Sequence, residues 1–482
     1  MFRRYRSIPT TRPPSPPQKA EGRPILRKLP ESAQAGGSVV RVLLGSRLVH
    51  GGLIVGAGIL LGNVTGFFRV AVTAWLLGTH ARADVLAVAM GPLDTLNSVI
   101  VNTMLFAFVP MLLLRHDGDR AAVFARSARV FAAIVLALSV LVAVFARKLI
   151  PIVGPGLAAP ERAQAAVLLR LFAPATFFSG CAAIFSALLY TDRRFLVPGL
   201  YQTCLNGGII AGALLFRNTL GIDGFAIGYT AGTALQLLLT WFFSRDLRRA
   251  PQSPLRLSLR DVLVRPGMFV LYGGLIAGNL VVTRAFATHG GSGMAAAFDY
   301  STRCTSVVLA YLVYPVASTL IPEIARLRGT NATRKAYSLI DRGVGLMALA
   351  ATASCAIGIL LRTPVIALLF ERGSFTAEST RLVSAVFLGF APTIVGWALL
   401  DLIARCFFAL DRWRLPLIAA FIPISLNVAI TYFLRVSGRL KDPALLGLGA
   451  SIGLLAGFAA LFVMIHIGRN AAKLAPSLVE AG

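Results

Sequence analysis

Charged side chains recur inside long apolar stretches of this 482-residue sequence, where an ionised group is costly. Three of them are the arginines Arg69, Arg284 and Arg303. A guanidinium group stays charged, and its fork of donors matches phosphate oxygens, so arginines lining a cavity would bind an anionic headgroup. The competing interpretation is that they form internal salt bridges or extend to the membrane surface. We expect Arg69 and Arg303 to bind ligand, while Arg284 fits either interpretation.

Carboxylates accompany these arginines at spacings that suggest ion pairs. Asp299 precedes Arg303 by four residues, and Asp401 precedes Arg405 by the same interval. Residues four apart share one face of a helix, so each pair could neutralise itself. Arg405 is therefore as readily a salt-bridge residue as a ligand-binding one. Asp84, Asp299 and Asp401 are also candidate sites for a coupling ion.

Uncharged polar residues extend the set of candidates. Asn63 precedes Arg69 in the same apolar stretch, and Asn97 and Asn102 follow Asp94 in the next one. Asp94, Asn97 and Asn102 either hydrogen-bond across helices or line a cavity, and the sequence favours neither. We include Asn63, Asn97 and Asn102 among the residues expected to line a substrate cavity.

Residues for catalysis or metal binding do not come together in the sequence. The five histidines are scattered without metal-ligand spacing, and no phosphate-binding glycine-rich loop with its lysine occurs. The five cysteines lack C-x-x-C spacing and fall in apolar stretches, so we interpret them as small buried residues. We expect no enzymatic activity, no metal and no cofactor. Transport would be coupled to the membrane potential, Na⁺ or H⁺ rather than directly to ATP.

The elements that position these residues are membrane-spanning helices. The sequence is 56% hydrophobic and 14% charged, with a mean hydropathy of +0.75, which excludes an ordinary water-soluble fold. A β-barrel would show short alternating segments instead of these continuous apolar runs. We expect an all-α polytopic membrane protein with about twelve spans, each of about 20 residues. The predicted spans are 52–77, 85–113, 129–147, 165–190, 196–216, 222–243, 267–288, 294–322, 341–361, 381–409, 415–434 and 444–467.

The distribution of basic residues predicts the orientation in the membrane. Alternate loops are rich in arginine, as is the N-terminal tail, and such loops face the cytoplasm. Both termini are therefore expected to be cytoplasmic. The net charge of +27 could also suggest nucleic-acid binding, but no nucleic-acid-binding motif accompanies it.

Two halves of the sequence repeat each other. Phe172-Ala173-Pro174 and Leu205-Asn206 correspond to Phe390-Ala391-Pro392 and Leu426-Asn427 in the same order. Such a parallel repeat is typical of transporters whose two lobes rock around a central cavity. The predicted organisation is a disordered, basic, proline-rich cytoplasmic tail (1–44), a six-helix lobe (45–243), a basic cytoplasmic linker (244–266), a second six-helix lobe (267–468) and a short cytoplasmic tail (469–482).

Several of these motifs resemble those of a known family. The segments 66–69 with Asp84, 283–303 and 369–376 are similar to motifs of the MviN/MurJ-type flippases, within the multidrug/oligosaccharidyl-lipid/polysaccharide exporter superfamily. The resemblance covers about residues 45–435 and is most specific in 283–303. It implies alternating access in a V-shaped cationic cavity that carries undecaprenyl-pyrophosphate-linked sugars, chiefly lipid II. Arg69 and Arg303 correspond to cavity arginines of that family, and Asp84 to the acid of its motif.

The sequence also departs from the family pattern. Asn63 stands where the lipid II flippases carry an arginine, and Asn97 and Asn102 lie at about the positions of an arginine and a glutamate. The chain ends near the twelfth span, whereas typical members have two more helices. We therefore expect a divergent flippase that moves an undecaprenyl-pyrophosphate-linked glycan to the outer leaflet for cell-envelope polysaccharide assembly. The alternatives are a lipid II flippase of peptidoglycan synthesis, a small-molecule or drug exporter of the same superfamily, and a transport-inactive scaffold.

The expected partners follow from this interpretation. They are membrane lipid and a polyprenyl-pyrophosphate-linked glycan, with cell-envelope synthesis enzymes as further candidates and no nucleic acid. The expected location is the bacterial cytoplasmic (inner) membrane, where the protein would act as a monomer.

Overall fold

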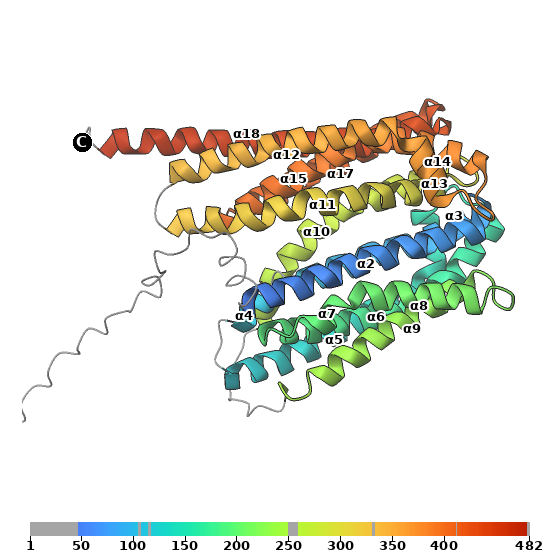
Figure 1. The fold of residues 1–482 in the computed structure, drawn as a ribbon, viewed down its shortest axis with the longest axis horizontal. Coiled ribbons are helices and arrows are strands. Elements are labelled where there is room, and N and C mark those ends of the chain that lie inside the picture. Colours follow the sequence, from blue (N-terminus) through green and yellow to red (C-terminus); the bar gives the residue numbers. More distant parts are fainter. Residues whose placement is uncertain are drawn as a thin grey trace, which may run out of the picture. The chain divides into compact units, whose positions relative to one another are not determined.

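The structure, a computed structural model, is helical throughout the part of the chain that it describes (Figure 1). That part comprises residues 47–104, 108–113, 117–248, 259–329, 333–410 and 412–479, and no strand occurs in it. The predicted all-α fold class is confirmed. The helices are α2 (Arg47–Leu77), α3 (Ala81–Thr103), α4 (Val109–Leu113), α5 (Asp117–Val153), α6 (Ala159–Thr191), α7 (Leu196–Gly199), α8 (Tyr201–Leu215), α9 (Asp223–Phe243), α10 (Leu259–Ala287), α11 (Met294–Gly329), α12 (Thr333–Leu360), α13 (Arg362–Phe370), α14 (Ala377–Phe390), α15 (Thr393–Ala409), α16 (Arg414–Ala419), α17 (Phe421–Val436) and α18 (Leu448–Val479), with 3₁₀ helices at Arg439–Lys441 and Pro443–Leu445.

Packing divides the chain into two units, Met1–Gly52 and Leu53–Gly482. The candidate functional residues all belong to the second unit. The predicted tail 1–44 and most of the predicted linker 244–266 lie outside the described residues or their described side chains. The boundaries of the two lobes and the orientation of the termini stay predictions.

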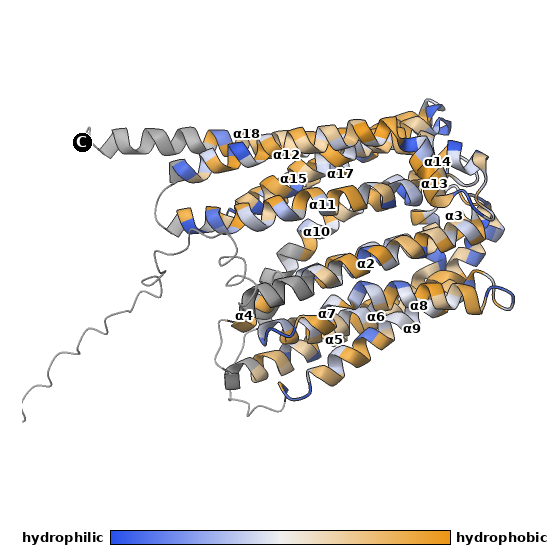
Figure 2. Ribbon diagram, in the orientation of Figure 1, coloured by the Kyte–Doolittle hydropathy of each residue, from blue (hydrophilic) through white to orange (hydrophobic). Residues whose placement is uncertain are grey.

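Apolar helices long enough to cross a bilayer make up most of the second unit. Nine single helices among the described residues meet the requirement, and two bent pairs bring the total to eleven. The bends are 42° in α11, between Val313 and Pro315, and 43° between α14 and α15. Figure 2 shows hydrophobic residues along the helices and many of the hydrophilic residues near their ends. The protein is therefore a multi-pass membrane protein.

The predicted span 196–216 is not one helix. It is divided into α7, which has 4 residues, and α8, which has 15. Pro198 lacks a backbone N–H and Gly199 has no side chain to restrict its backbone, so the two residues together favour a break at this point. This region therefore does not supply a single helix of the length that was expected.

Helix packing repeats between the first half, α2–α9, and the second half, α10–α18. In the first half α5 packs on α6, α6 on α9 and α9 on α8; in the second, α12 packs on α15, α15 on α18 and α18 on α17. Figure 1 shows these two groups of helices, blue to green and yellow to red. Helix α3 contacts α10 and α11 and so joins the halves. This order supports the parallel repeat read from the sequence motifs.

The repeated asparagines make equivalent bonds in the two halves. In α8, Asn206 Nδ2 donates to the carbonyl oxygen of Gly62 in α2 at 3.3 Å. In α17, Asn427 Nδ2 donates to the carbonyl oxygen of Asn279 in α10 at 3.1 Å. Both asparagines are buried. A buried amide must find a partner, and here each one ties its helix to the first helix of its own half.

Glycines bring α8 and α9 together backbone to backbone. The glycines that face each other are Gly208 and Gly212 of α8 and Gly224, Gly228 and Gly232 of α9. A Cβ atom at Gly208 would overlap the carbonyl oxygen of Gly228, and one at Gly212 would overlap that of Gly224. Such small residues at four-residue intervals allow close contact between membrane helices. The α8–α9 pair is consequently a tight helical hairpin.

Candidate functional site

Arg69 lies in α2 and is paired with a carboxylate of α3. Its Nη1 atom is 3.0 Å from Asp94 Oδ2, and the two side chains are 15% and 29% exposed. Asp94 was one of the residues that the sequence left undecided, and the structure shows that it hydrogen-bonds across helices. Arg69 is thus held in a fixed position by its partner.

Arg284 lies in α10 and binds one carboxylate oxygen of Asp299 in α11 through two of its nitrogens. Its Nε and Nη2 atoms are 2.8 and 2.7 Å from Asp299 Oδ1. The expected pairing of Asp299 with Arg303 is therefore wrong. The reason is tertiary: Arg284 is 6% exposed and lies directly beside Asp299, whereas Arg303 reaches across to α2. A Cβ atom at Gly91 would overlap the Arg284 guanidinium, so this arginine of the second half rests on α3 of the first.

Arg303 lies in α11 and also crosses between the halves. Its Nη2 atom donates to the carbonyl oxygen of Asn63 in α2 at 2.8 Å. A Cβ atom at Gly66 would overlap the guanidinium and would lie 3.1 Å from Asn206 Nδ2. The glycine therefore provides the space that the arginine occupies.

These five ionised groups leave one excess positive charge. Three guanidinium groups, Arg69, Arg284 and Arg303, face two carboxylates, Asp94 and Asp299. Among the described residues, each arginine also retains one buried N–H without a hydrogen-bond partner: Arg69 Nε, Arg284 Nη1 and Arg303 Nε. Buried donors without partners are uncommon and mark a place where a ligand or water could accept. The cluster is suited to an anion with several oxygens.

The three asparagine candidates have different surroundings. Asn63 accepts the Arg303 bond through its main-chain oxygen. Asn97 is 1% exposed and donates to Tyr229 Oη at 2.9 Å, so in this conformation it links α3 to α9 inside the first half. Asn102 is exposed near the end of α3. Only Asn63 therefore contacts the arginine cluster.

Loop segments of the two halves meet along what we call the loop seam. It joins residues 75–84 and 154–156 of the first half to residues 288–300 and 374–379 of the second. Its hydrogen bonds include Ser374 N to Trp75 O at 2.9 Å, Tyr300 Oη to Gly78 O at 2.8 Å, Thr79 Oγ1 with Ser379 Oγ at 2.7 Å and Gly156 N to Thr288 Oγ1 at 2.8 Å. The seam therefore holds these segments of the two halves together.

Asp84 belongs to this loop seam and not to the arginine cluster. Its carboxylate accepts from Gly293 N at 2.5 Å and Ala296 N at 2.8 Å. These are main-chain donors at the start of α11, so Asp84 of α3 caps a helix of the other half. In the loop before α11, burial and the nearby Arg435 and Arg162 lower the pKa of His289.

Asp401 and Arg405 form the ion pair that their spacing predicted. Arg405 Nε is 2.8 Å from Asp401 Oδ2 within α15. The side chain of Arg405 is 29% exposed and that of Asp401 is 26% exposed. The pair neutralises itself inside one helix, as the alternative interpretation expected.

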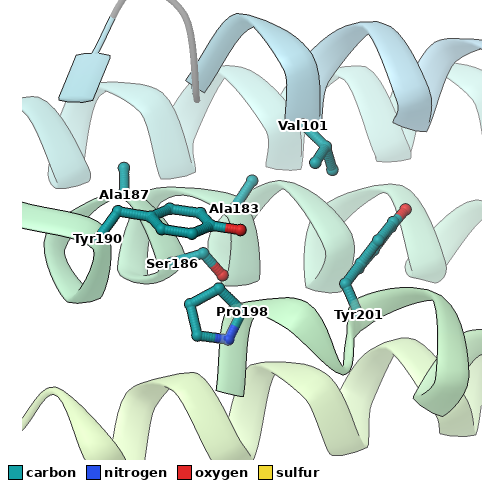
Figure 3. Close-up of a pocket in the computed structure, with 7 residues that line it drawn as sticks. All are labelled: Val101, Ala183, Ser186, Ala187, Tyr190, Pro198 and Tyr201. Atoms are coloured by element: carbon teal, nitrogen blue, oxygen red, sulfur yellow. The ribbon is translucent and has the colours of Figure 1, made fainter. Parts of the chain in front are cut away.

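Two other pockets are not lined by these arginines, and one of them is an open site of about 370 Å³ lined by Gly438, Arg439, Asp442 and Leu445. A cavity of about 40 Å³ lies beside Tyr190 and Tyr201 and has a largely apolar lining (Figure 3). Such a volume holds only a few water molecules. Over the described residues, no group of three or more His, Cys, Asp or Glu side chains is arranged to hold a metal ion.

Two bundles of membrane-spanning helices, joined through the arginine cluster and the loop seam, define a polytopic α-helical membrane protein. Solved structures share this fold. One titled "Lipid II flippase MurJ, inward closed conformation" superposes with a TM-score of 0.73 at 20% identity, covering 86% of this chain and 87% of that one. An inward-facing MATE family transporter of the MOP superfamily gives 0.69 at 14% identity, covering 84% and 96%.

Sequence comparison identifies the family. The family model described as "Lipid II flippase MurJ" matches residues 73–477, and this chain belongs to that family of flippases. The probable lipid II flippase MurJ of Rhizobium meliloti (strain 1021) is 28% identical over 456 residues, 89% of this chain and 83% of the relative. The lipid II flippase MurJ of Burkholderia cenocepacia is 25% identical over 423 residues, 84% and 81% respectively.

Sequence reasoning missed Gly66 and Gly91 as parts of the site. Both glycines lie near polar residues within apolar helices, which was the only signal in the sequence. Their role depends on side chains of the other half, Arg303 for Gly66 and Arg284 for Gly91. Tyr229, which accepts the bond from Asn97, carried no signal at all in the sequence.

Proposed function

We propose that this protein is a lipid II flippase of peptidoglycan synthesis, which moves an undecaprenyl-pyrophosphate-linked precursor to the outer leaflet of the bacterial cytoplasmic membrane. The observation that carries the proposal is the arginine cluster with its single excess positive charge and its three unpartnered N–H groups. A diphosphate offers several acceptor oxygens to such donors. Family membership and the names of the relatives favour lipid II over another lipid-linked glycan, which was the main expectation from sequence.

The position of the loop seam suggests the direction in which the headgroup would move across the membrane. If the arginine-rich loops are cytoplasmic, the loop after α2 is on the outer side, and so is the loop seam. The headgroup would enter between the halves from the cytoplasmic side and reach Arg69 and Arg303. Opening of the seam would then expose it to the outer leaflet, as in other transporters built from two rocking lobes.

A drug exporter of the same superfamily is less well supported. The likeness to the MATE transporter is a likeness of fold only, at 14% identity. A typical cationic drug would meet an excess positive charge at the arginine cluster, and like charges at close range repel. An anionic substrate avoids this repulsion.

The proposal is tested by expressing the protein in a bacterium depleted of its own lipid II flippase. The measurement is the amount of lipid II accessible at the outer leaflet. We expect the unaltered protein to restore accessibility and Arg303→Ala to abolish it, because the headgroup loses a charge-assisted contact of about 1.5–3 kcal/mol.

Arg326→Ala is the matched control. Arg326 lies in the same helix, is 68% exposed and pairs with Glu323 through a surface salt bridge. Its removal should leave transport unchanged. No restoration by well-expressed unaltered protein would reject lipid II as the substrate, and full transport by Arg303→Ala would reject the arginine cluster as the site.

A further inference from the structure

The guanidinium of Arg303 occupies a slot in the surface of α2. The floor of the slot is Gly66, and the carbonyl oxygen of Asn63 accepts the bond from Nη2 at 2.8 Å. Asn206 closes one side, where its amide donates to the preceding carbonyl, that of Gly62. Arg303 comes from the second half of the protein, whereas the slot is formed entirely by the first.

A side chain at position 66 would displace the Arg303 guanidinium from this slot. Any Cβ atom at position 66 would overlap Arg303 Nη2, and rigid α2 backbone lies behind it. Elsewhere in the same helix, a Cβ atom at Gly56 would meet nothing within 4 Å. The two glycines therefore differ in that only Gly66 gives space to a side chain of the other half.

The bond between Arg303 and α2 is weaker than the bond that a phosphate could make. The acceptor is the uncharged main-chain carbonyl of Asn63, which lies within α2 and so also takes part in the hydrogen-bond pattern of that helix. In addition, Arg303 Nε is buried without a hydrogen-bond partner. Hydrogen bonds between a guanidinium and an anionic oxygen are roughly twice as strong as neutral ones. A phosphate within reach of Arg303 would therefore compete for it successfully.

We propose that Arg303 is a latch, seated in the Gly66 slot while the site is empty and drawn out of it by the diphosphate headgroup. The inference rests on the proposed function, because it assumes an anionic headgroup at this site. Seated, Arg303 ties α11 to α2 and holds the two halves together at the arginine cluster. Bound to the headgroup, it releases α2, and the loop seam becomes free to open.

This assigns a positioning role to Gly66, which does not itself touch the substrate. The latch couples headgroup binding to opening because a ligand shifts a conformational equilibrium only through different interactions in the two states. Here the different interaction is a single guanidinium that has two mutually exclusive partners.

The test measures opening of the seam through a cysteine at Ser379, which is 2% exposed and bonded to Thr79 in the closed seam. The reporter is Ser379→Cys in a chain whose five native cysteines are replaced by alanine. The protein is reconstituted in phosphatidylcholine vesicles, and the rate of labelling by a membrane-impermeant maleimide is recorded. We expect Gly66→Ala to raise this rate roughly tenfold, the effect of losing one charge-assisted hydrogen bond, and Gly56→Ala to leave it unchanged.

A double variant separates the latch from general damage to α2. In an Arg303→Ala background, Gly66→Ala should change the rate little, because the overlapping guanidinium is gone and only the 3.1 Å approach to Asn206 Nδ2 remains. A further tenfold rise there, or no rise with Gly66→Ala alone, would overturn the latch. Undecaprenyl diphosphate in the vesicles should raise the labelling rate of the reporter with Gly66 and Arg303 unchanged toward the rate of Gly66→Ala. A labelling rate that does not respond to this lipid would also overturn the latch.

The lipid II assay keeps the two proposals apart. Loss of transport in Arg303→Ala together with an unchanged labelling rate in Gly66→Ala rejects the latch and leaves the flippase function intact. Full transport in Arg303→Ala rejects the site on which both rest.

Discussion

Each arginine of the site combines a fixed position with an unused donor. Arg69 and Arg284 are held by carboxylates, and Arg303 by a main-chain oxygen. A guanidinium that is already oriented loses less freedom when a ligand arrives, so its remaining N–H can contribute more to binding. The acidic residues thus serve the anion site by orienting its cations while leaving one positive charge in excess.

The Arg284–Asp299 pair gives a prediction for stability. Arg284→Ala leaves the Asp299 carboxylate without its partner in a buried place and should lower the free energy of unfolding by about 3 kcal/mol. The double variant Arg284→Ala/Asp299→Ala should lose less than Arg284→Ala alone. Thermal unfolding in detergent measures both, and a double variant less stable than either single one would contradict this account.

Sequence spacing was a reliable guide to one ion pair and not to the other. Asp401 and Arg405 are four residues apart and pair within their helix as predicted. Asp299 and Arg303 have the same spacing, yet each finds a partner on another helix. An intrahelical pair is worth only a few tenths of a kcal/mol, so buried tertiary neighbours decide the outcome, and these cannot be read from spacing.

At the scale of elements, the first turn of α11 depends on the other half of the protein. Its N–H groups at Gly293 and Ala296 are satisfied by Asp84 of α3. The start of a helix carries several N–H groups without intrahelical partners, and a carboxylate there is stabilising. Opening of the loop seam must therefore break this cap or carry α3 along with α11.

Asp84→Asn should weaken the cap and favour the open seam. An uncharged amide oxygen accepts less strongly, and we expect a loss of about 1 kcal/mol. The labelling rate of the Ser379→Cys reporter should therefore rise several-fold. Glu161→Gln is the control, since Glu161 caps its own helix α6 by accepting from Ala158 N at 2.9 Å. An equal rise in both variants would count against a specific role for Asp84.

The sequence predicted elements better than it predicted their contacts. Long apolar runs gave most of the spans, because a bilayer imposes a minimum length on any helix that crosses it. Asp84 was selected as a candidate, yet its role as a cap links residues more than 200 positions apart. That role depends on how two loops meet, which no local pattern records. The break at Leu200, between α7 and α8, was missed because its flanks are as apolar as those of a continuous span.

At the scale of the whole molecule, the two halves are tied at two levels, the loop seam and the arginine cluster. At each level a side chain of one half hydrogen-bonds a main-chain group of the other half: Asp84 and Tyr300 in the seam, and Arg303 in the arginine cluster. Alternating access then requires these bonds to break in concert. The repeated packing of the helices suggests that each half moves largely as one body while they do.

A covalent link across the seam should stop transport. Thr79→Cys with Ser379→Cys places two sulfurs where hydroxyl oxygens lie 2.7 Å apart, which allows a disulfide with little movement. Oxidation should abolish the appearance of lipid II at the outer leaflet, and a reducing agent should restore it. Either cysteine alone is the control. Continued transport by the fully oxidised pair would show that the seam need not open.

The hairpin of α8 and α9 has a consequence for biosynthesis. With 15 residues, α8 is shorter than the roughly 20 that a helix needs to cross a bilayer unaided. The facing glycines let its backbone lie directly on that of α9, which spans the membrane over 21 residues. The insertion machinery would accordingly have to hold α8 until α9 has been synthesised and then release both helices together into the lipid. A bulky residue at Gly212 or Gly228 would be expected to act first on the yield of inserted protein, before the transport cycle begins.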